Sequence, residues 1–159
     1  MALTVRRATP VDQDFVNATG TQSAHTSLSP VRPASAHAAA EAFLRAAQFC
    51  AEREDGTTLI AERDGERAGF VMLLLDLTED VTLQRQAFIV YMAVAPEHQR
   101  RGVARALLAA AQEEARARGE SHISLMVTQA NEPARMLYTR AGFIDERAQM
   151  TKPLRSGAR

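Results

Sequence analysis

The short polar stretch between Pro96 and Gly102 is the part of the chain best suited to bind an anion. It follows an apolar run rich in β-branched and aromatic residues, Phe88 to Val94, and precedes a stretch rich in Ala, Leu, Arg and Glu. That order predicts a strand, a turn and a helix whose first backbone N–H groups have no partner within the helix. These donors and the positive end of the helix dipole favour a phosphate group.

Other residues of the turn are compatible with this chemistry but do not prove it. Arg100 and Arg101 could add charge-assisted hydrogen bonds to phosphate oxygens, and Gly102 would let the backbone approach a ligand closely. The stretch contains neither the Gly-Lys-Ser/Thr of a P-loop nor the Gly-x-Gly-x-x-Gly of a dinucleotide site. Taken alone, the turn leaves open whether it binds an anion or only begins a helix.

The elements that would position this turn follow from the periodicity of the chain. The expected strands are, in order, residues 3–7, 57–61, 68–75, 88–94, 122–128 and 143–150. The expected helices begin near Pro10, near Ala38, after Gly102 and after Asn131. Residues Gly20 to Pro33 should form a loop, and residues 76–86 a loop or a fraying strand end. A helix between strands 88–94 and 122–128 should make these two strands parallel neighbours, as in a mixed α/β fold.

Length and composition indicate one soluble domain covering residues 1–159. Hydrophobic residues make up 46% of the chain and charged residues 24%, and the formal net charge is zero. This balance argues against broad electrostatic binding of nucleic acid. No apolar run approaches the ~18 residues of a membrane helix, and the N-terminus lacks the apolar region of a signal peptide. Cys50 is the only cysteine, so we expect no intrachain disulfide, no thiolate metal cluster and a reducing, cytoplasmic setting. From the charge and hydropathy we expect no membrane and no nucleic-acid partner.

Two segments of the chain resemble the central motifs of the GCN5-related N-acetyltransferase (GNAT) superfamily. The first, Gln99-Arg100-Arg101-Gly102-Val103-Ala104, is similar to the family signature Gln/Arg-x-x-Gly-x-Gly/Ala and follows the usual Val-x-Pro-Glu. The second, residues 131–143, is similar to the pattern Asn-x-x-Ala-x-x-Leu-Tyr-x-x-x-Gly-Phe. The resemblance covers residues 90–143 well, and the N-terminal half only in the order of its elements.

The resemblance implies a particular version of the mixed α/β fold. We expect a central twisted sheet of six to seven strands, mostly antiparallel, flanked by about four helices. One parallel pair of strands should splay apart, and in this family the gap admits the thioester of acetyl-CoA.

The resemblance also implies which residues bind acetyl-CoA, with no metal. Amides of the turn and of the first helical turn would hold the pyrophosphate, at Gln99, Arg100, Arg101, Gly102, Val103, Ala104 and Arg105. Met92 and Val94 would pair their backbone with the pantetheine arm, and Asn131 would hold that arm while capping its helix. The N–H of Met92 would polarise the acetyl carbonyl, and Tyr138 would protonate the departing thiolate.

The sequence names no general base. An attacking amine must lose a proton, and some family members carry a glutamate on the strand before the phosphate turn, but residues 87–94 contain no carboxylate. The nearest candidates, each also compatible with a structural role, are Asp76, Glu79, Asp80, Tyr91 and His25.

The implied function is transfer of the acetyl group of acetyl-CoA to a primary amine, on a small molecule or a protein, by direct attack in a ternary complex. A non-catalytic CoA-binding or regulatory domain of the same fold is the alternative, and an unrelated nucleotide binder would require the second motif to be coincidence. A homodimer is compatible with the family. Acceptor recognition would fall to about residues 10–54, where the loop from Gly20 to Pro33 could be a lid or disordered.

Overall fold

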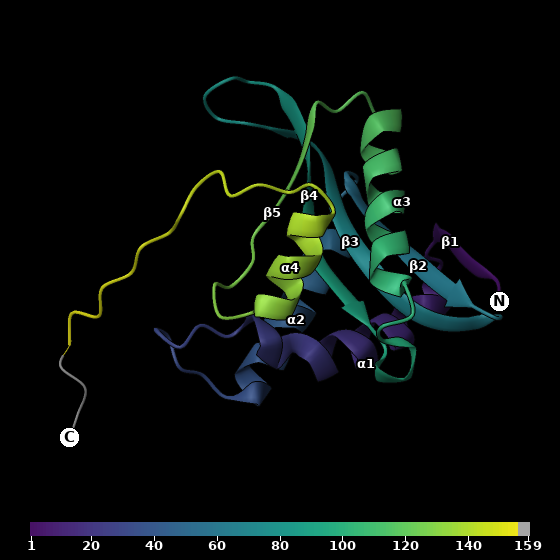
Figure 1. Ribbon diagram of the computed structural model, residues 1–159, viewed down its shortest axis with the longest axis horizontal. Coiled ribbons are helices and arrows are strands. Elements are labelled where there is room, and N and C mark those ends of the chain that lie inside the picture. The colour runs from purple at the N-terminus through teal and green to yellow at the C-terminus, as the bar shows by residue number, and fades with distance from the viewer. Residues whose placement is uncertain (156–159) are drawn as a thin grey trace.

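The computed structural model describes residues 1–155 and shows one mixed sheet with helices on both faces (Figure 1). The sheet order is β1-β2-β3-β4-β5. The strands are β1 Leu3–Arg7, β2 Gly56–Arg63, β3 Glu66–Thr78, β4 Arg85–Val94 and β5 His122–Leu125. The α-helices are α1 Gln13–Ser23, α2 Ala36–Ala51, α3 Val103–Ala117 and α4 Glu132–Arg140, and the short 3-10 helices are η1 Pro10–Asp12, η2 Ala24–Ser27 and η3 Pro96–His98.

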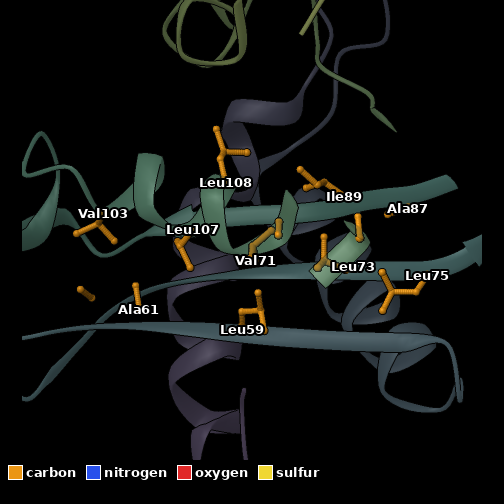
Figure 2. Packing of buried hydrophobic residues seen from close by; sticks show 13 residues of the cluster. Leu59, Ala61, Val71, Leu73, Leu75, Ala87, Ile89, Val103, Leu107 and Leu108 are labelled. Atoms are coloured by element: carbon orange, nitrogen blue, oxygen red, sulfur yellow. The ribbon is translucent and has the colours of Figure 1, made fainter. Parts of the chain in front are cut away.

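Each face of the sheet buries its own hydrophobic core, because side chains alternate between the faces along a strand. On one face, Leu107 and Leu108 of α3 pack against strand residues that include Val71, Leu73 and Ile89 (Figure 2). On the other face, α1 and α2 supply Val16, Phe43 and Ala47, which pack with Phe70 and Met72 of β3. The sheet therefore separates an α3 side from an α1/α2 side.

Strand β4 pairs with β3 along almost its whole length, but with β5 only near its start. The parallel pairing joins Gln86–Ile89 to His122–Leu125 and goes no further. At the same point the register with β3 shifts, because Met72 lies opposite Tyr91 whereas Leu73 lies opposite Ile89. Val90 is thus the extra residue of a β-bulge, which bends a strand and increases its twist.

Most of the fold predicted from the sequence is confirmed. The mixed α/β class, the hairpin around Asp64-Gly65 and the parallel pair β4–β5 are present. Strands β3 and β4 extend into both ends of the segment 76–86, which agrees with the predicted fraying strand end, whereas β5 ends at Leu125 instead of residue 128.

The predicted strand at 143–150 is wrong for this structure, so the described residues form five strands instead of six to seven. A strand requires a second backbone beside it, and residues 144–155 make no hydrogen bond to the backbone of the rest of the described chain.

The predicted loop from Gly20 to Pro33 is also partly wrong. Residues 20–23 complete α1 and residues 24–27 form η2. A Cβ at Gly20 would lie 2.0 Å from Cζ of Phe43, so this glycine allows α1 to pack closely on α2. Within the described residues, no helix is both long and apolar enough to cross a membrane.

Asp12 ties the start of the first helix to the sheet. Its side chain is 0% exposed and accepts hydrogen bonds from Arg6 of β1 at 2.7 and 3.0 Å, from Arg67 of β3 at 2.7 Å and from the N–H of Thr9 at 2.8 Å. The hydrogen bonds from Arg6, above all, hold the pKa of Asp12 well below its usual range, although burial opposes this shift. One carboxylate thus links two strands to η1 and α1.

Replacing Asp12 with alanine should lower the free energy of unfolding by about 3 kcal/mol, because two arginines lose their shared partner. The pKa of Asp12 is lower in the folded chain than in the unfolded chain. Its stabilisation is therefore complete above about pH 4 and is lost as the pH falls below that value. Urea unfolding at neutral pH and in acid measures both effects.

The exposed Asp14 of α1 provides the matched control. Asp14→Ala should change the stability by no more than about 0.5 kcal/mol at neutral pH. Equal stability of Asp12→Ala and the wild type at neutral pH would contradict the role given to Asp12.

Candidate functional site

The turn between β4 and α3 leaves open space in front of the helix. Arg100 and Gly102 have left-handed backbone angles, with φ of 58° and 82°. Gln99 donates a hydrogen bond from Nε2 to the carbonyl of Val94 at 3.3 Å, which fastens the turn to the end of β4. Gln99, Arg100, Arg101 and Gly102 are exposed, and a Cβ at Gly102 would meet no atom within 4 Å.

The first backbone N–H groups of α3 have no acceptor among the described residues. The first amide bonded within the helix is that of Ala106, which donates to the carbonyl of Gly102 at 3.0 Å. No side chain caps the helix, so the amides of Val103, Ala104 and Arg105 remain available. These free amides and the helix dipole are the features on which the predicted anion site depends.

Gly69 of β3 fixes where α3 begins. It lies opposite Val94, and a Cβ on it would lie 2.7 Å from the carbonyl oxygen of Ala93 and 3.2 Å from Cγ1 of Val103. Only a residue without a side chain lets the buried Val103 pack against the end of β4. Gly69 is absent from the predicted site residues, although a glycine within a strand often signals such a close approach.

Met92 and Val94 lie on the part of β4 that has left β5. They pair with Val71 and Gly69 of β3, and no described strand lies on their other side. Their half-buried side chains pack against the α3-side core, as does that of Tyr138. The structure therefore brings the predicted residues Met92, Val94 and Tyr138 to the face of the sheet that carries α3.

Asn131 caps α4 as the sequence predicts. Its Oδ1 accepts a hydrogen bond from the N–H of Ala134 at 3.3 Å. Figure 1 shows that α3 and α4 both begin at the lower end of the sheet, where β4 also ends. Two helix N-termini thus lie at the end of the sheet where Met92 and Val94 are located.

Tyr138 on α4 is half-buried, with its ring edge-on to that of Phe143 at a centroid distance of 5.8 Å. No hydrogen bond joins its hydroxyl to another described residue. Burial raises the pKa of Tyr138, and a smaller contribution from Tyr91 acts in the same direction. The phenol therefore stays protonated near neutral pH, as a proton donor must.

Tyr91 lies just after the bulge, on the α1/α2 side of the sheet. Its ring packs against Phe43 with centroids 4.8 Å apart, and its hydroxyl lies 3.2 Å from Oγ of Ser23. Burial raises its pKa too. Nearby in the fold, Thr128 donates to the carbonyl of Ser27 at 2.6 Å, which joins η2 to the segment after β5. No sequence motif marks Ser23 and Thr128, because only the tertiary fold brings them to the α1/α2 side of the sheet.

The acids that the sequence offers as a general base are engaged elsewhere. Asp76 forms ion pairs with Arg85, the first residue of β4, and with Arg118. A strand rise of about 3.3 Å per residue puts Arg85 roughly 20 Å from Met92. Glu79 binds Arg147 and accepts from the N–H of Thr82. These contacts indicate structural roles for both acids.

The remaining candidates are exposed and give no geometric support. Asp80 lies in the β3–β4 connection and His25 on η2, with Nδ1 of His25 3.2 Å from the carbonyl oxygen of Gln22. A cavity of about 400 Å³ lies between α1, α2 and β2, but none of the predicted site residues lines it. Among residues 1–155, no group of three His, Cys, Asp or Glu side chains could hold a metal ion.

Comparison with known proteins assigns this geometry to a family. Residues 22–143 match the model of the Acetyltransferase (GNAT) family. The chain therefore belongs to that family, as the two sequence motifs imply.

Two curated proteins are similar to the chain. Streptothricin acetyltransferase of Streptomyces lavendulae is 36% identical over 93 residues, which are 58% of this chain and 47% of that protein. The match thus spans about half the length of that relative. The uncharacterized N-acetyltransferase YhfO of Bacillus subtilis (strain 168) is 32% identical over 115 residues, covering 72% of this chain and 74% of YhfO.

The fold is shared with a solved acetyltransferase. AAC(6')-Iy, in complex with the bisubstrate analogue CoA-S-monomethyl-acetylneamine, superposes with a TM-score of 0.72 at 18% identity. The alignment covers 98% of this chain and all of that one. This likeness supports the mixed sheet and its helices as the fold of the family.

The environment of the two tyrosines can be measured directly, because the chain contains two tyrosines and no tryptophan. In Tyr91→Phe, phenolate absorbance comes from Tyr138 alone. Burial raises the pKa of Tyr138, so the folded variant should gain this absorbance above the value of about 10 at which the urea-unfolded chain titrates. Stability should accordingly fall as the pH rises through that range.

Tyr138→Phe isolates Tyr91 in the same way and should also titrate above the unfolded value. A folded Tyr138 that titrates at or below the unfolded value would show that the phenol is solvated, contrary to the packing described here.

Proposed function

We propose that this protein is an N-acetyltransferase that transfers the acetyl group of acetyl-CoA to a primary amine by direct attack in a ternary complex. The observation that carries the proposal is the uncapped start of α3 beside the unpaired end of β4, on the face that holds Tyr138. The CoA analogue bound to AAC(6')-Iy supports CoA as the donor carrier.

The turn residues suit the pyrophosphate of CoA. Free amides of Val103, Ala104 and Arg105 face open space in front of Gly102, so they can donate to phosphate oxygens without any rearrangement of a cap. The exposed residues Gln99, Arg100, Arg101 and Arg105 lie next to these amides in the sequence. Arginine forks add charge-assisted bonds to phosphate.

The unpaired end of β4 suits the pantetheine arm, whose amides can bond to a free strand edge as another strand would. We assign this contact to the backbone of Met92 and Val94, and a second contact to Asn131. The carbonyl of Asn131's side chain is already used by the helix cap, so its amide group is the part left to hold the arm.

The chemistry then needs little from the protein beyond orientation and one proton. Bound acetyl-CoA supplies a thioester carbonyl and a thiolate leaving group. The N–H of Met92 donates to the carbonyl oxygen as negative charge develops there. Tyr138 donates its phenolic proton to the sulfur, and its raised pKa keeps that proton in place until the transfer.

The acceptor should reach the thioester from the α1/α2 side of the sheet. Tyr91, Ser23 and Thr128 border that side, and they offer hydroxyl groups for positioning a polar amine. Streptothricin acetyltransferase is named for streptothricin, and AAC(6')-Iy is named an aminoglycoside N-acetyltransferase, which supports transfer to an amine nitrogen here. The incoming ammonium loses one proton to solvent before it attacks, and the second proton that the nitrogen loses replaces the one that Tyr138 gives to the sulfur.

Gly102→Glu should abolish CoA binding, because it places a carboxylate where the phosphates approach. Like charges at such a distance cost several kcal/mol, so the affinity should fall at least about 100-fold in isothermal titration with CoA. Gly119→Glu is the matched control. Gly119 also has a positive φ, 75°, and open space around its Cβ position, but it lies at the other end of α3.

Both variants carry similar backbone strain of roughly 1 kcal/mol. Gly119→Glu should therefore lose stability to the same extent and keep its CoA affinity. Normal CoA affinity of Gly102→Glu would rule out the pyrophosphate site at this turn.

Tyr138→Phe should reduce kcat by about 100-fold and leave the Kd for acetyl-CoA unchanged, because it removes only the proton donor. Thiol release from acetyl-CoA with a panel of amines measures kcat. Tyr91→Phe is the comparison variant, and it should alter KM for the amine more than kcat. Full activity of Tyr138→Phe would exclude the acid role of this phenol.

The same assay separates catalysis from the regulatory alternative. An enzyme releases thiol in the presence of at least one amine. Tight CoA binding without thiol release on any amine of the panel would instead support a CoA-binding regulatory domain.

A further inference from the structure

The bulge at Val90 decides the side of the sheet on which Tyr91 lies. Up to the bulge, the side chains of β4 alternate between the faces, and those of Phe88 and Val90 pack with the core on the α1/α2 side. Regular alternation would turn Tyr91 to the α3 side. Instead, Tyr91 packs with the same α1/α2 core as Val90, and Met92 packs with the core on the α3 side. The extra residue has thus redirected one side chain, as bulges next to active sites often do.

The redirected phenol meets a hydroxyl group of the first helix. Oη of Tyr91 lies 3.2 Å from Oγ of Ser23, and either hydroxyl can donate this hydrogen bond. Oγ of Ser23 also donates to the carbonyl of Gly20 at 3.3 Å, so the phenol is the donor of the pair when both bonds are present. Ser23 is the last residue of α1 and is only partly buried. The pair therefore leads from the half-buried phenol toward solvent at the end of α1.

The phenol of Tyr91 is suited to pass a proton on but not to keep it. Burial raises the pKa of Tyr91, and side-chain hydrogen bonds with Ser23 and Thr26 oppose this shift. Near neutral pH the side chain is therefore a neutral phenol. Its oxygen can accept a proton only while its own proton leaves. Tyr91 is consequently a better relay than a general base.

The proposed reaction needs a proton path at this place. One proton of the incoming ammonium must reach solvent, but residues 85–94 contain no carboxylate, and Asp76 and Glu79 are held in ion pairs. Tyr91 directly precedes Met92, whose N–H we assign to the acetyl carbonyl. Its side chain therefore leaves β4 on the acceptor side, one residue away from that N–H group.

We propose that Tyr91 and Ser23 form a hydroxyl relay that carries this proton from the amine to solvent, an inference that rests on the proposed transfer to an amine. The ammonium donates a proton to Oη of Tyr91 as the phenolic proton moves to Oγ of Ser23. At the same time, the hydroxyl proton of Ser23 passes to a water molecule of the solvent. Both side chains end neutral, and the nitrogen keeps the electron pair with which it attacks the thioester. Rotation of the two hydroxyls restores the starting arrangement.

Tyr91→Phe and Ser23→Ala each interrupt the relay. Each should lower kcat/KM for the amine by about tenfold, mostly through KM, because less of the bound amine becomes neutral. The double variant should lose no more than either single variant, since a relay interrupted once no longer conducts. Ser23→Thr keeps the hydroxyl and should stay within about threefold of the wild type. Thiol release from acetyl-CoA over a range of amine concentrations measures these values.

Ser27→Ala is the matched control. Ser27 lies on η2, and its hydroxyl donates to the carbonyl of Ala24 in the same short helix at 2.7 Å. This variant should keep the kcat/KM of the wild type. All these variants should keep the wild-type Kd for CoA and the wild-type circular dichroism spectrum, because the relay lies on the face of the sheet opposite to α3.

Solvent isotope effects separate a relay from a hydrogen bond that is merely structural. In mixtures of H2O and D2O, kcat/KM of the wild type should fall along a curve, because more than one proton moves in the same step. Each single variant should lose this curvature. Every measurement uses the same fraction of neutral amine, which removes the effect of deuterium on the ionisation of the amine itself.

Three results would overturn the relay: additive losses in the double variant, wild-type kcat/KM in Ser23→Ala, or curvature that survives in Tyr91→Phe. Each of them would leave the acetyl transfer itself intact. A wild type that releases no thiol with any amine would instead overturn the proposed function, and the relay with it.

Discussion

The end of the parallel pairing between β4 and β5 is the constraint from which the arrangement of the site follows. The register shift at Val90 bends β4 away after four paired residues, although β3 stays bonded to it almost to the end. The backbone of Met92 and Val94 consequently forms an unpaired strand edge beyond the end of the β4–β5 pairing. A polar edge in such a place needs a partner, and a ligand with amide groups is suited to be one.

The packing of α3 places the free amides of the helix next to the unpaired edge of β4. Val103 is buried against the end of β4, and Gly69 supplies the room for that contact. The free amides of the helix therefore begin where the strand edge ends, and no flexible loop has to close to align them. Rigid elements thus define the candidate donor site. Most of its groups are backbone amides, so little of it depends on particular side chains.

The two faces of the sheet carry different side chains of the candidate site. The α3 side holds Tyr138, and the α1/α2 side holds Tyr91, and burial raises the pKa of both phenols. Asp12 keeps α1 in place on the second face through Arg6 and Arg67. In the proposed reaction the donor and the acceptor approach from opposite faces and meet where β4 separates from β5.

The sequence by itself determined the features that depend on neighbouring residues. Alternation and helical periodicity identified most strands and helices, the turn before α3 and the cap at Asn131, because local hydrogen bonding and local packing encode them. The two motifs identified the family by resemblance. Only the tertiary structure decided the bulge at Val90, the contact that requires Gly20, the ion pairs that occupy Asp76 and Glu79, and the absence of pairing at 143–150. Each of these depends on a backbone or side chain far away in the sequence, and strand register in particular is set by the partner strand.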